Sequence, residues 1–470
     1  MNRYFKIYIS IITVVILSSC KISKDISKPP LPLPAGYSGA TTTDTANIAA
    51  IKWQSFFTDK ALQTLIDSAV QNNYDMQAAM QHIAAAQLIV KQSKLGYLPQ
   101  ASVNIGATIN RPSDNSLNGL SLSQFLGRSY VEDYAAAVNL SWEADIWGKI
   151  KNKKAAALAA YLQTTEAKKA IQTKLVAAVA DGYFNLLLLD AQLGIANKNL
   201  ALNDNTLSVL KLQFDAGQVT ALGVQQAEAQ KLVAAQLIPF LQRHISLQEN
   251  ALSILTGKLP GKIQRSSTLA NAAFATTLST GLPADLVNNR PDVKTYELAL
   301  NIANAHAGIA RANMYPSLTI TAAGGINSFM ASNWFNIPAS LFGMATGGIT
   351  QPLFQRKELR TKYELAKTDR EKAVIQFRQS VLTAVGEVSD ALVKTTRLQQ
   401  QEAVAQARVN TLQKAITNAD LLYKNGMATY LEIITAQSNT LQGELELTTL
   451  KKEQLNAVVE LYRALGGGWR

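Results

Sequence analysis

A short motif that occurs twice constrains the fold of this chain more than any other feature. Its two copies share an aromatic residue, a glycine, a threonine and a leucine at matching places: Phe214-Asp215-Ala216-Gly217-Gln218-Val219-Thr220-Ala221-Leu222 and Tyr423-Lys424-Asn425-Gly426-Met427-Ala428-Thr429-Tyr430-Leu431. Each copy lies between two long stretches rich in alanine, leucine, glutamine and lysine, which favour helices. The pattern predicts a tight turn between long antiparallel helices, with the glycine left-handed and the threonine capping the second helix. It also indicates an internal duplication.

Composition restricts the classes of function. With 47% hydrophobic and 17% charged residues among 470, the chain is globular rather than disordered. The net charge of +12 would suit nucleic acid or an acidic membrane surface, but lysine-rich solvated helices explain it more simply. The single cysteine, Cys20, excludes a disulfide framework and a cysteine zinc site. Three separated histidines give no pattern of metal ligands, so we expect no metal and no cofactor.

The N-terminus predicts a lipid anchor. Arg3 and Lys6 precede an apolar run from position 7 to 17 that is too short to span a bilayer but fits a signal peptide. The run ends in Leu17-Ser18-Ser19-Cys20, which resembles the bacterial lipobox, where cleavage precedes a cysteine that then carries lipid. A generic signal peptide with an incidental cysteine is the alternative. We therefore predict a signal peptide over 1–19 and a lipidated linker over 20–50.

Residues 51–256 form the first predicted structural repeat, and alternation of side chains locates its strands. Residues 101–109 and 134–146 each place apolar side chains on one face and mostly polar or small ones on the other. A surface hairpin on a soluble domain is the alternative, but the strand lengths and the aromatic residues Trp142 and Trp147 favour a transmembrane barrel. Helices are predicted over 60–97, 149–214 and 220–256, with a loop over 111–130.

The same order recurs in a second predicted repeat over 284–466, after a linker over 257–283 that is rich in glycine and proline. Only a tail over 467–470 follows. The predicted helices cover 285–314, 358–423 and 429–465, and the predicted strands begin near Leu318 and near residue 340. The last helix carries leucines at coiled-coil spacing on two stripes, which suits a helix packed between two neighbours in a ring.

One chain cannot complete the predicted barrel. Four strands do not close, and lipid does not tolerate open sheet edges. Two chains would give eight strands, whose interior is filled by side chains, whereas three would give about 12 strands and room for a lumen.

Taken together, the motifs resemble those of the TolC-like outer-membrane efflux proteins, in particular their lipoprotein branch of the NodT type. The resemblance covers nearly the whole mature chain. It is carried by the lipobox, by both tip motifs, and by segments 53–59, 142–148, 289–293, 308–317 and 461–469. It implies a mainly α protein with membrane β-strands: an internally duplicated protomer of a homotrimer, whose 12-stranded β-barrel in the outer membrane continues into a long periplasmic α-helical barrel.

The resemblance also implies partners and sites. The duct would dock on a periplasmic adaptor (membrane fusion) protein and serve an inner-membrane efflux pump, with Cys20 carrying a diacylglycerol thioether and an N-acyl chain in outer-membrane lipid. The adaptor-docking tips would be Gly217, Gln218, Val219 and Thr220 in the first copy and Gly426, Met427, Ala428 and Thr429 in the second.

The closed periplasmic aperture would involve Glu432, Tyr423 and Thr435. In the family a second acid is common at the position of Thr435, and Gly223 occupies the matching position of the first repeat, where an acid can also occur. Glu432 has a second explanation, because Thr429-Tyr430-Leu431-Glu432 is a capping box. The sequence is compatible with both roles.

The predicted function is therefore a passive exit duct in an efflux system, located in the outer membrane with most of the chain in the periplasm. We expect no enzymatic activity, because the sequence has no nucleophile motif, phosphate loop or zinc-helix motif. No recognition motif supports nucleic-acid binding. The alternative is a lipid-anchored periplasmic helical-bundle scaffold without a pore, whose strands would form a soluble hairpin.

Overall fold

The computed structural model describes residues 48–274 and 289–470. Cys20 and part of the predicted linker 257–283 lie outside these ranges, so the lipid anchor stays a prediction. The described chain divides into two compact units. The first comprises 85–162 and 298–375, and the second comprises 48–84, 163–274, 289–297 and 376–470.

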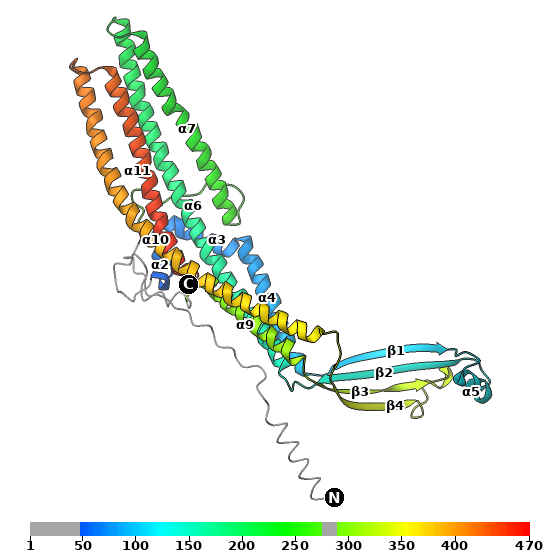
Figure 1. Ribbon diagram of the computed structural model, residues 1–470. Helices are drawn as coiled ribbons and strands as arrows, with labels where there is room; N and C mark the ends of the chain where they lie inside the picture. The colour runs from blue at the N-terminus through cyan, green and yellow to red at the C-terminus, as the bar shows by residue number, and fades with distance from the viewer. Residues whose placement is uncertain (1–47, 275–288) are drawn as a thin grey trace, which may run out of the picture. The chain divides into compact units, whose positions relative to one another are not determined.

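The first unit is built on an antiparallel sheet of four strands in the order β1-β2-β3-β4 (Figure 1). The strands are β1 (Gln100–Asn110), β2 (Val131–Glu143), β3 (Ser317–Ser328) and β4 (Leu341–Thr350). Val103 pairs with Val138, which pairs with Gly324 on its other side. Because side chains alternate along a strand, this register places the apolar positions predicted from the sequence on one face of the sheet.

Local chemistry corrects the predicted strand and loop limits in this unit. The strand β2 ends at Glu143 rather than at 146, because the Asp145 carboxylate accepts from Ile150 N and Lys151 N at 2.8 Å each and caps the next helix. The predicted loop over 111–130 contains a helix, α5 (Leu117–Leu126). The Ser116 hydroxyl accepts from Gly119 N at 3.1 Å and starts this helix.

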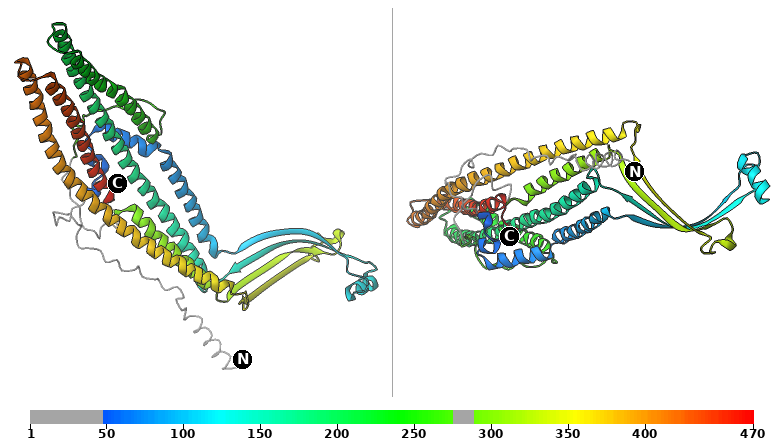
Figure 2. Two further views of the ribbon diagram at one scale, coloured as in Figure 1. Left: turned by 45° about the horizontal axis from the view of Figure 1, so that its top comes forward. Right: turned by 90° about the horizontal axis from the view of Figure 1, so that it is seen from below.

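The second unit consists of helices, and α4, α6, α9 and α10 each supply residues to both units. In the views of Figures 1 and 2, the hairpin of α6 and α7 lies beside the hairpin of α10 and α11. The α-helices are α2 (Trp53–Phe56), α3 (Lys60–Asn72), α4 (Tyr74–Lys94), α6 (Lys149–Asp215), α7 (Ala221–Leu255), α9 (Pro291–Ala312), α10 (Glu358–Lys424) and α11 (Tyr430–Ala464). The bounds of α6, α7, α10 and α11 agree with the predicted ones to within a residue.

The predicted helix over 60–97 is wrong in one respect, since it breaks at Asn73 into α3 and α4. The Asn73 side-chain oxygen accepts from Asp75 N at 2.9 Å and from Met76 N at 3.2 Å, which caps α4. Its amide nitrogen donates to Leu255 O at 3.1 Å. The Asn73 side chain therefore bonds to backbone groups of both α4 and α7. These bonds stabilise a helix break at a position that has neither proline nor glycine.

Aromatic packing joins distant parts of the chain in the core of the second unit. The Tyr462 ring stacks on Phe56 with centroids 4.0 Å apart, and its hydroxyl donates to Ile51 O at 2.7 Å. Burial raises the pKa of Tyr462 to about 12. Among the described helices, α6 alone has the length and apolar content to cross a membrane, but 61% of that stretch is buried, as in a core helix.

A buried arginine ties the start of α9 to α10 and to the C-terminus. Arg290 is only 5% exposed at its side chain and lies 2.6 Å from Asp292 and 2.9 Å from Glu387. It also donates to Ala464 O at 3.0 Å, and Arg463 lies 3.5 Å from the same Glu387 carboxylate. Glu387 is therefore part of an ion-pair network rather than an isolated charge on the helix surface.

Candidate functional site

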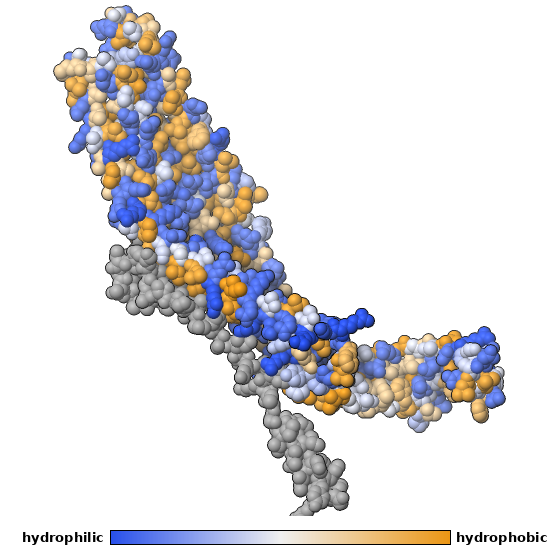
Figure 3. Space-filling model, in the orientation of Figure 1, coloured by the Kyte–Doolittle hydropathy of each residue, from blue (hydrophilic) through white to orange (hydrophobic). Residues whose placement is uncertain are grey.

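One face of the sheet is apolar and uncovered. Ile105 is 71% exposed and Ile349 is 73% exposed, on the face that also carries Val103 and Val138. The opposite face carries mainly small and polar side chains, such as those of Ser102, Asn104, Asn139, Ser141, Thr319 and Thr321. Figure 3 shows apolar surface along the sheet. Within the described residues nothing covers this face, and lipid is the solvent that favours such a surface.

Aromatic side chains gather at the end of the sheet where the strands meet the helices of the first unit. Trp142 Nε1 donates to Tyr97 O at 2.8 Å. Trp147 Nε1 donates to Pro316 O at 2.6 Å, and its ring stacks on Tyr315 with centroids 4.9 Å apart. Tryptophan and tyrosine with a bonded polar tip are typical of membrane–water interfaces. The sheet thus has the apolar face and the aromatic border of a membrane barrel wall.

The two repeated motifs form the turns at the ends of the helical hairpins, as predicted. Gly217 and Gly426 have φ of 71° and 73°, the left-handed conformation that glycine adopts without penalty. Gln218 N donates to Gln213 O at 2.8 Å, and Met427 N donates to Leu422 O at 2.8 Å. These bonds close the Schellman geometry at the ends of α6 and α10.

The two turns differ in how they start the next helix. Thr429 and Glu432 form a full capping box, in which Glu432 Oε2 accepts from Thr429 N at 2.9 Å and from the Thr429 hydroxyl. Thr220 lies at the N-cap of α7 but makes no side-chain capping bond, so the prediction that it caps by its hydroxyl is wrong. Glycine at 223 offers no carboxylate to orient that hydroxyl.

Contacts between the two hairpins meet at the turns, and the sequence did not reveal them. The Tyr423 hydroxyl donates to Gln213 Oε1, and the Tyr430 hydroxyl donates to Gln226 Oε1 at 2.9 Å. A Cβ at Gly223 would lie 3.0 Å from the Tyr430 ring. The glycine therefore leaves room for the tyrosine of the other hairpin, whose ring would have to shift if residue 223 had a side chain.

The three predicted aperture residues have different surroundings. Glu432 and Thr435 are exposed on neighbouring turns of α11, whereas Tyr423 is half-buried. The hydrogen bond from the Thr429 hydroxyl lowers the pKa of Glu432. Burial raises the pKa of Tyr423. Glu432 is thus an ionised, exposed carboxylate at the end of its hairpin.

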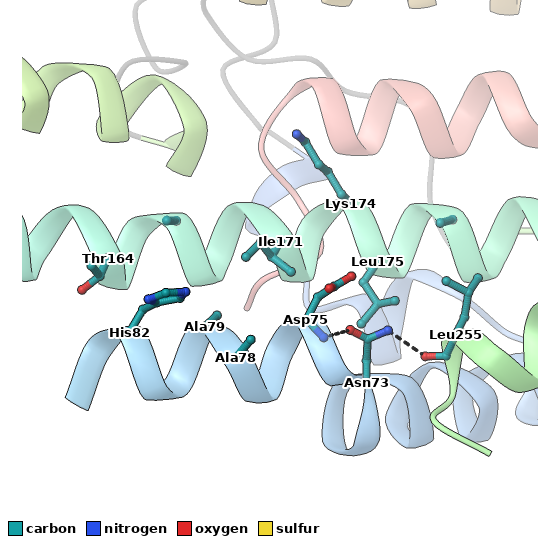
Figure 4. Close-up of a pocket in the computed structure, with 12 residues that line it drawn as sticks. Asn73, Asp75, Ala78, Ala79, His82, Thr164, Ile171, Lys174, Leu175 and Leu255 are labelled. Carbon is teal, nitrogen blue, oxygen red and sulfur yellow. Dashed lines mark hydrogen bonds between the residues drawn. The ribbon is translucent and has the colours of Figure 1, made fainter. Parts of the chain in front are cut away.

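A further hollow, of about 570 Å³, lies between α4 and α6 (Figure 4). Its lining combines small and apolar side chains from both helices with Asn73, Asp75, His82 and Lys174 at its margin. Over residues 48–274 and 289–470, no group of three or more histidine, cysteine or acidic side chains is placed to hold a metal ion. The hollow has the character of a helix-packing surface rather than a reactive site.

An uncovered apolar sheet and paired helical hairpins define the class of outer-membrane channel subunits. Comparison with known proteins agrees. The family model "Outer membrane efflux protein" matches residues 65–258 and 282–467. The chain therefore belongs to the outer membrane efflux protein family, and it is the outer-membrane channel component of an efflux system. The predicted fold class and outer-membrane location are confirmed, and the channel is supported over the scaffold alternative.

Individual relatives match along nearly their whole length. The toluene efflux pump outer membrane protein TtgF of Pseudomonas putida is 31% identical, over 98% of this chain and 97% of that protein. The cation efflux system protein CusC of Escherichia coli K12 is 28% identical, over 96% of this chain and 97% of that protein. A crystal structure of CusC superposes with a TM-score of 0.85 at 27% identity, over 95% of this chain and 99% of the other.

Proposed function

We propose that three copies of this chain form a passive exit duct. The observation that carries the proposal is the four-stranded sheet with an exposed apolar face, whose outer edges on β1 and β4 pair with no other strand of the described chain. Such edges need partners in lipid, and three copies supply about 12 strands, enough for a water-filled lumen. A polar solute would then cross without leaving water, which avoids the high cost of its desolvation. The duct performs no chemistry.

The hairpin turns are the proposed contact with a periplasmic adaptor, through which an inner-membrane pump supplies the cargo and the energy. Exposed apolar side chains gather at these ends and would be covered by a partner: Leu212, Phe214, Leu222, Leu421, Met427 and Leu431. The docking residues are those of the two turns, 217–220 and 426–429. Their rigid Schellman geometry presents the surface in a fixed shape.

Glu432 is the proposed charged residue of the periplasmic aperture, with Thr435 beside it on α11. Its exposure and its lowered pKa keep it ionised at neutral pH, so three copies would place three carboxylates around one opening. Tyr423 would act differently, because its hydroxyl is engaged with Gln213 of the neighbouring hairpin. It holds the wall of the aperture rather than facing the cargo.

Cys20 is the proposed lipid attachment site. Its place after the small residues Ser18 and Ser19, at the end of the apolar signal run, supports cleavage and acylation there. Lipid on the mature N-terminus would add an anchor to the membrane strands. Mass spectrometry of the mature N-terminal peptide tests this, and a peptide that begins elsewhere than Cys20 would contradict it.

Efflux in a host that lacks its own exit duct tests the proposed docking. Valine at Gly426 would force a β-branched residue into a left-handed conformation, so we expect efflux of a fluorescent substrate to fall. Valine at Gly386 is the matched control, since this glycine lies within α10 with open space around it. Full efflux in the Gly426→Val variant would contradict the docking role of the turn while leaving the channel intact.

A further inference from the structure

The junction between β4, which ends at Thr350, and α10, which begins at Glu358, exposes apolar and basic side chains together. Phe354 is 97% exposed and Leu353 is 81% exposed. Among the described aromatic residues, none makes a ring contact with Phe354. Water disfavours two adjacent large apolar side chains in this state, so a surface that covers them is expected.

Beyond Gln355, two residues have an unusual backbone. Arg356 and Lys357 have φ of 49° and 63°, a left-handed conformation that side chains other than glycine seldom adopt. At the equivalent place before α6, the first repeat has Gly148, with φ of 73°. Glycine would therefore satisfy the backbone conformation of such a junction, but the second junction has two cationic residues instead.

These cations have no acidic partner in the part of the chain that the structure describes. The nearest acid in sequence, Glu358, pairs with Lys362 at 2.5 Å. Arg360, in the first turn of α10, likewise has no ion pair with any described residue. The start of α10 adds the positive end of its helix dipole. The junction thus combines uncompensated positive charge with exposed apolar surface.

The junction lies at the aromatic border of the sheet. Gln351 Nε2 donates to Met314 O at 3.2 Å, which ties the junction to the segment before β3, next to Tyr315 and Trp147. Figure 3 shows strongly hydrophilic and apolar surface side by side over this end of the sheet. Because the sheet belongs to an outer-membrane channel, this end lies at the level of the periplasmic headgroups.

We propose that residues 353–357 bind an anionic phospholipid of the periplasmic leaflet. Phe354 and Leu353 enter the boundary between headgroups and acyl chains, while Arg356 and Lys357, with Arg360 behind them, contact the phosphate. Apolar side chains beside unpaired cations are the chemistry that recognises an anionic membrane surface. A second copy of the chain would need acids opposite these cations, and charge complementarity therefore favours lipid.

Glycine substitution separates a lipid role from a structural one. The variant R356G/K357G relieves the left-handed strain, so it should fold and melt at least as high as wild type. We expect wild-type protein in detergent to bind phosphatidylglycerol in preference to phosphatidylcholine, read by native mass spectrometry. The variant should bind phosphatidylglycerol about thirtyfold more weakly, as follows from about 1 kcal/mol per cation. The control K372Q/R378Q removes two exposed cations elsewhere on α10 and should keep the preference.

An undiminished phosphatidylglycerol preference in R356G/K357G, or an equal loss in K372Q/R378Q, would overturn the proposal. So would a Phe354→Ser variant that separates the oligomer without affecting lipid binding, since Phe354 would then contact a second copy. The lipid-binding proposal rests on the proposed membrane position of the sheet, but the lipid site and the channel function can fail separately. Conductance in planar bilayers reports on the channel, whereas the lipid preference is measured on the protein in detergent.

Discussion

The difference between the two hairpin turns gives a quantitative prediction, because the chain contains its own control. In the second turn, the Thr429 hydroxyl accepts from Leu431 N at 3.3 Å and is fixed by Glu432. In the first turn, Thr220 occupies the same N-cap position without a side-chain bond. Alanine at an N-cap that forms such a bond costs about 1 kcal/mol. Alanine at Thr220 removes no such bond, and its cost should be a few tenths at most.

A cost of about 1 kcal/mol corresponds to a roughly fivefold increase in the opening constant of the first turn of α11. Native-state hydrogen exchange, followed by mass spectrometry of peptides spanning each turn, measures this directly. We expect the first-turn amides of α11 to exchange about fivefold faster in Thr429→Ala. The first turn of α7 should change less than about twofold in Thr220→Ala. Equal acceleration in both variants, or none in Thr429→Ala, would refute the assigned difference in capping.

Three further predictions follow from the ion pairs and carboxylates. The variant Glu432→Gln should keep the fold, because glutamine also suits a capping box. Its closed state should be leakier or less selective for cations. Unchanged selectivity in single-channel recordings would show that Glu432 does not line the aperture. The variant Arg290→Ala should lower the melting temperature and reduce the free energy of unfolding by about 3 kcal/mol, because Glu387 loses its buried partner. The double variant Arg290→Ala/Glu387→Ala should recover part of this stability. No recovery would contradict the pairing. Burial alone would raise the pKa of Asp59, but hydrogen bonds from Ser266 and Ser267 outweigh burial and lower that pKa. The ionised Asp59 carboxylate therefore stabilises the fold at neutral pH, and this contribution is lost as pH falls below about 4. The stability gap between wild type and Asp59→Asn, measured by denaturant unfolding, should therefore narrow in acid; a gap independent of pH would contradict this.

Much of the fold follows from patterns that act over short distances. The alternation in 101–109 and 134–146 specifies strands with an apolar face, because side chains alternate by backbone geometry alone. The register then agrees with the predicted faces, since a slip by one residue would expose the polar side chains to lipid. The glycines of both turns were equally readable, because few residues other than glycine adopt positive φ.

Features that depend on distant partners could not be read in this way. The break at Asn73 depends on a bond to Leu255 O, and the role of Glu387 depends on Arg290. At Gly223, any side chain would crowd a tyrosine from the other hairpin. In each case the deciding contact joins positions far apart in the chain, and no local sequence pattern predicts it.

Strand length and helix caps show the same limit at shorter range. Asp145 could continue the alternation of β2 or cap α6, and the structure shows that it caps. Thr220 and Thr429 are equivalent in the motif, yet only Thr429 has a carboxylate to hold its hydroxyl. Where one side chain could play either of two local roles, the residues around it in the fold decide which role it takes.

The central claim, that copies of this chain enclose a water-filled duct, is tested most directly by the purified full-length protein in planar bilayers. We expect steady single-channel conductance from an oligomer in which native mass spectrometry counts three chains. A monomer that is soluble without detergent and gives no conductance would contradict it.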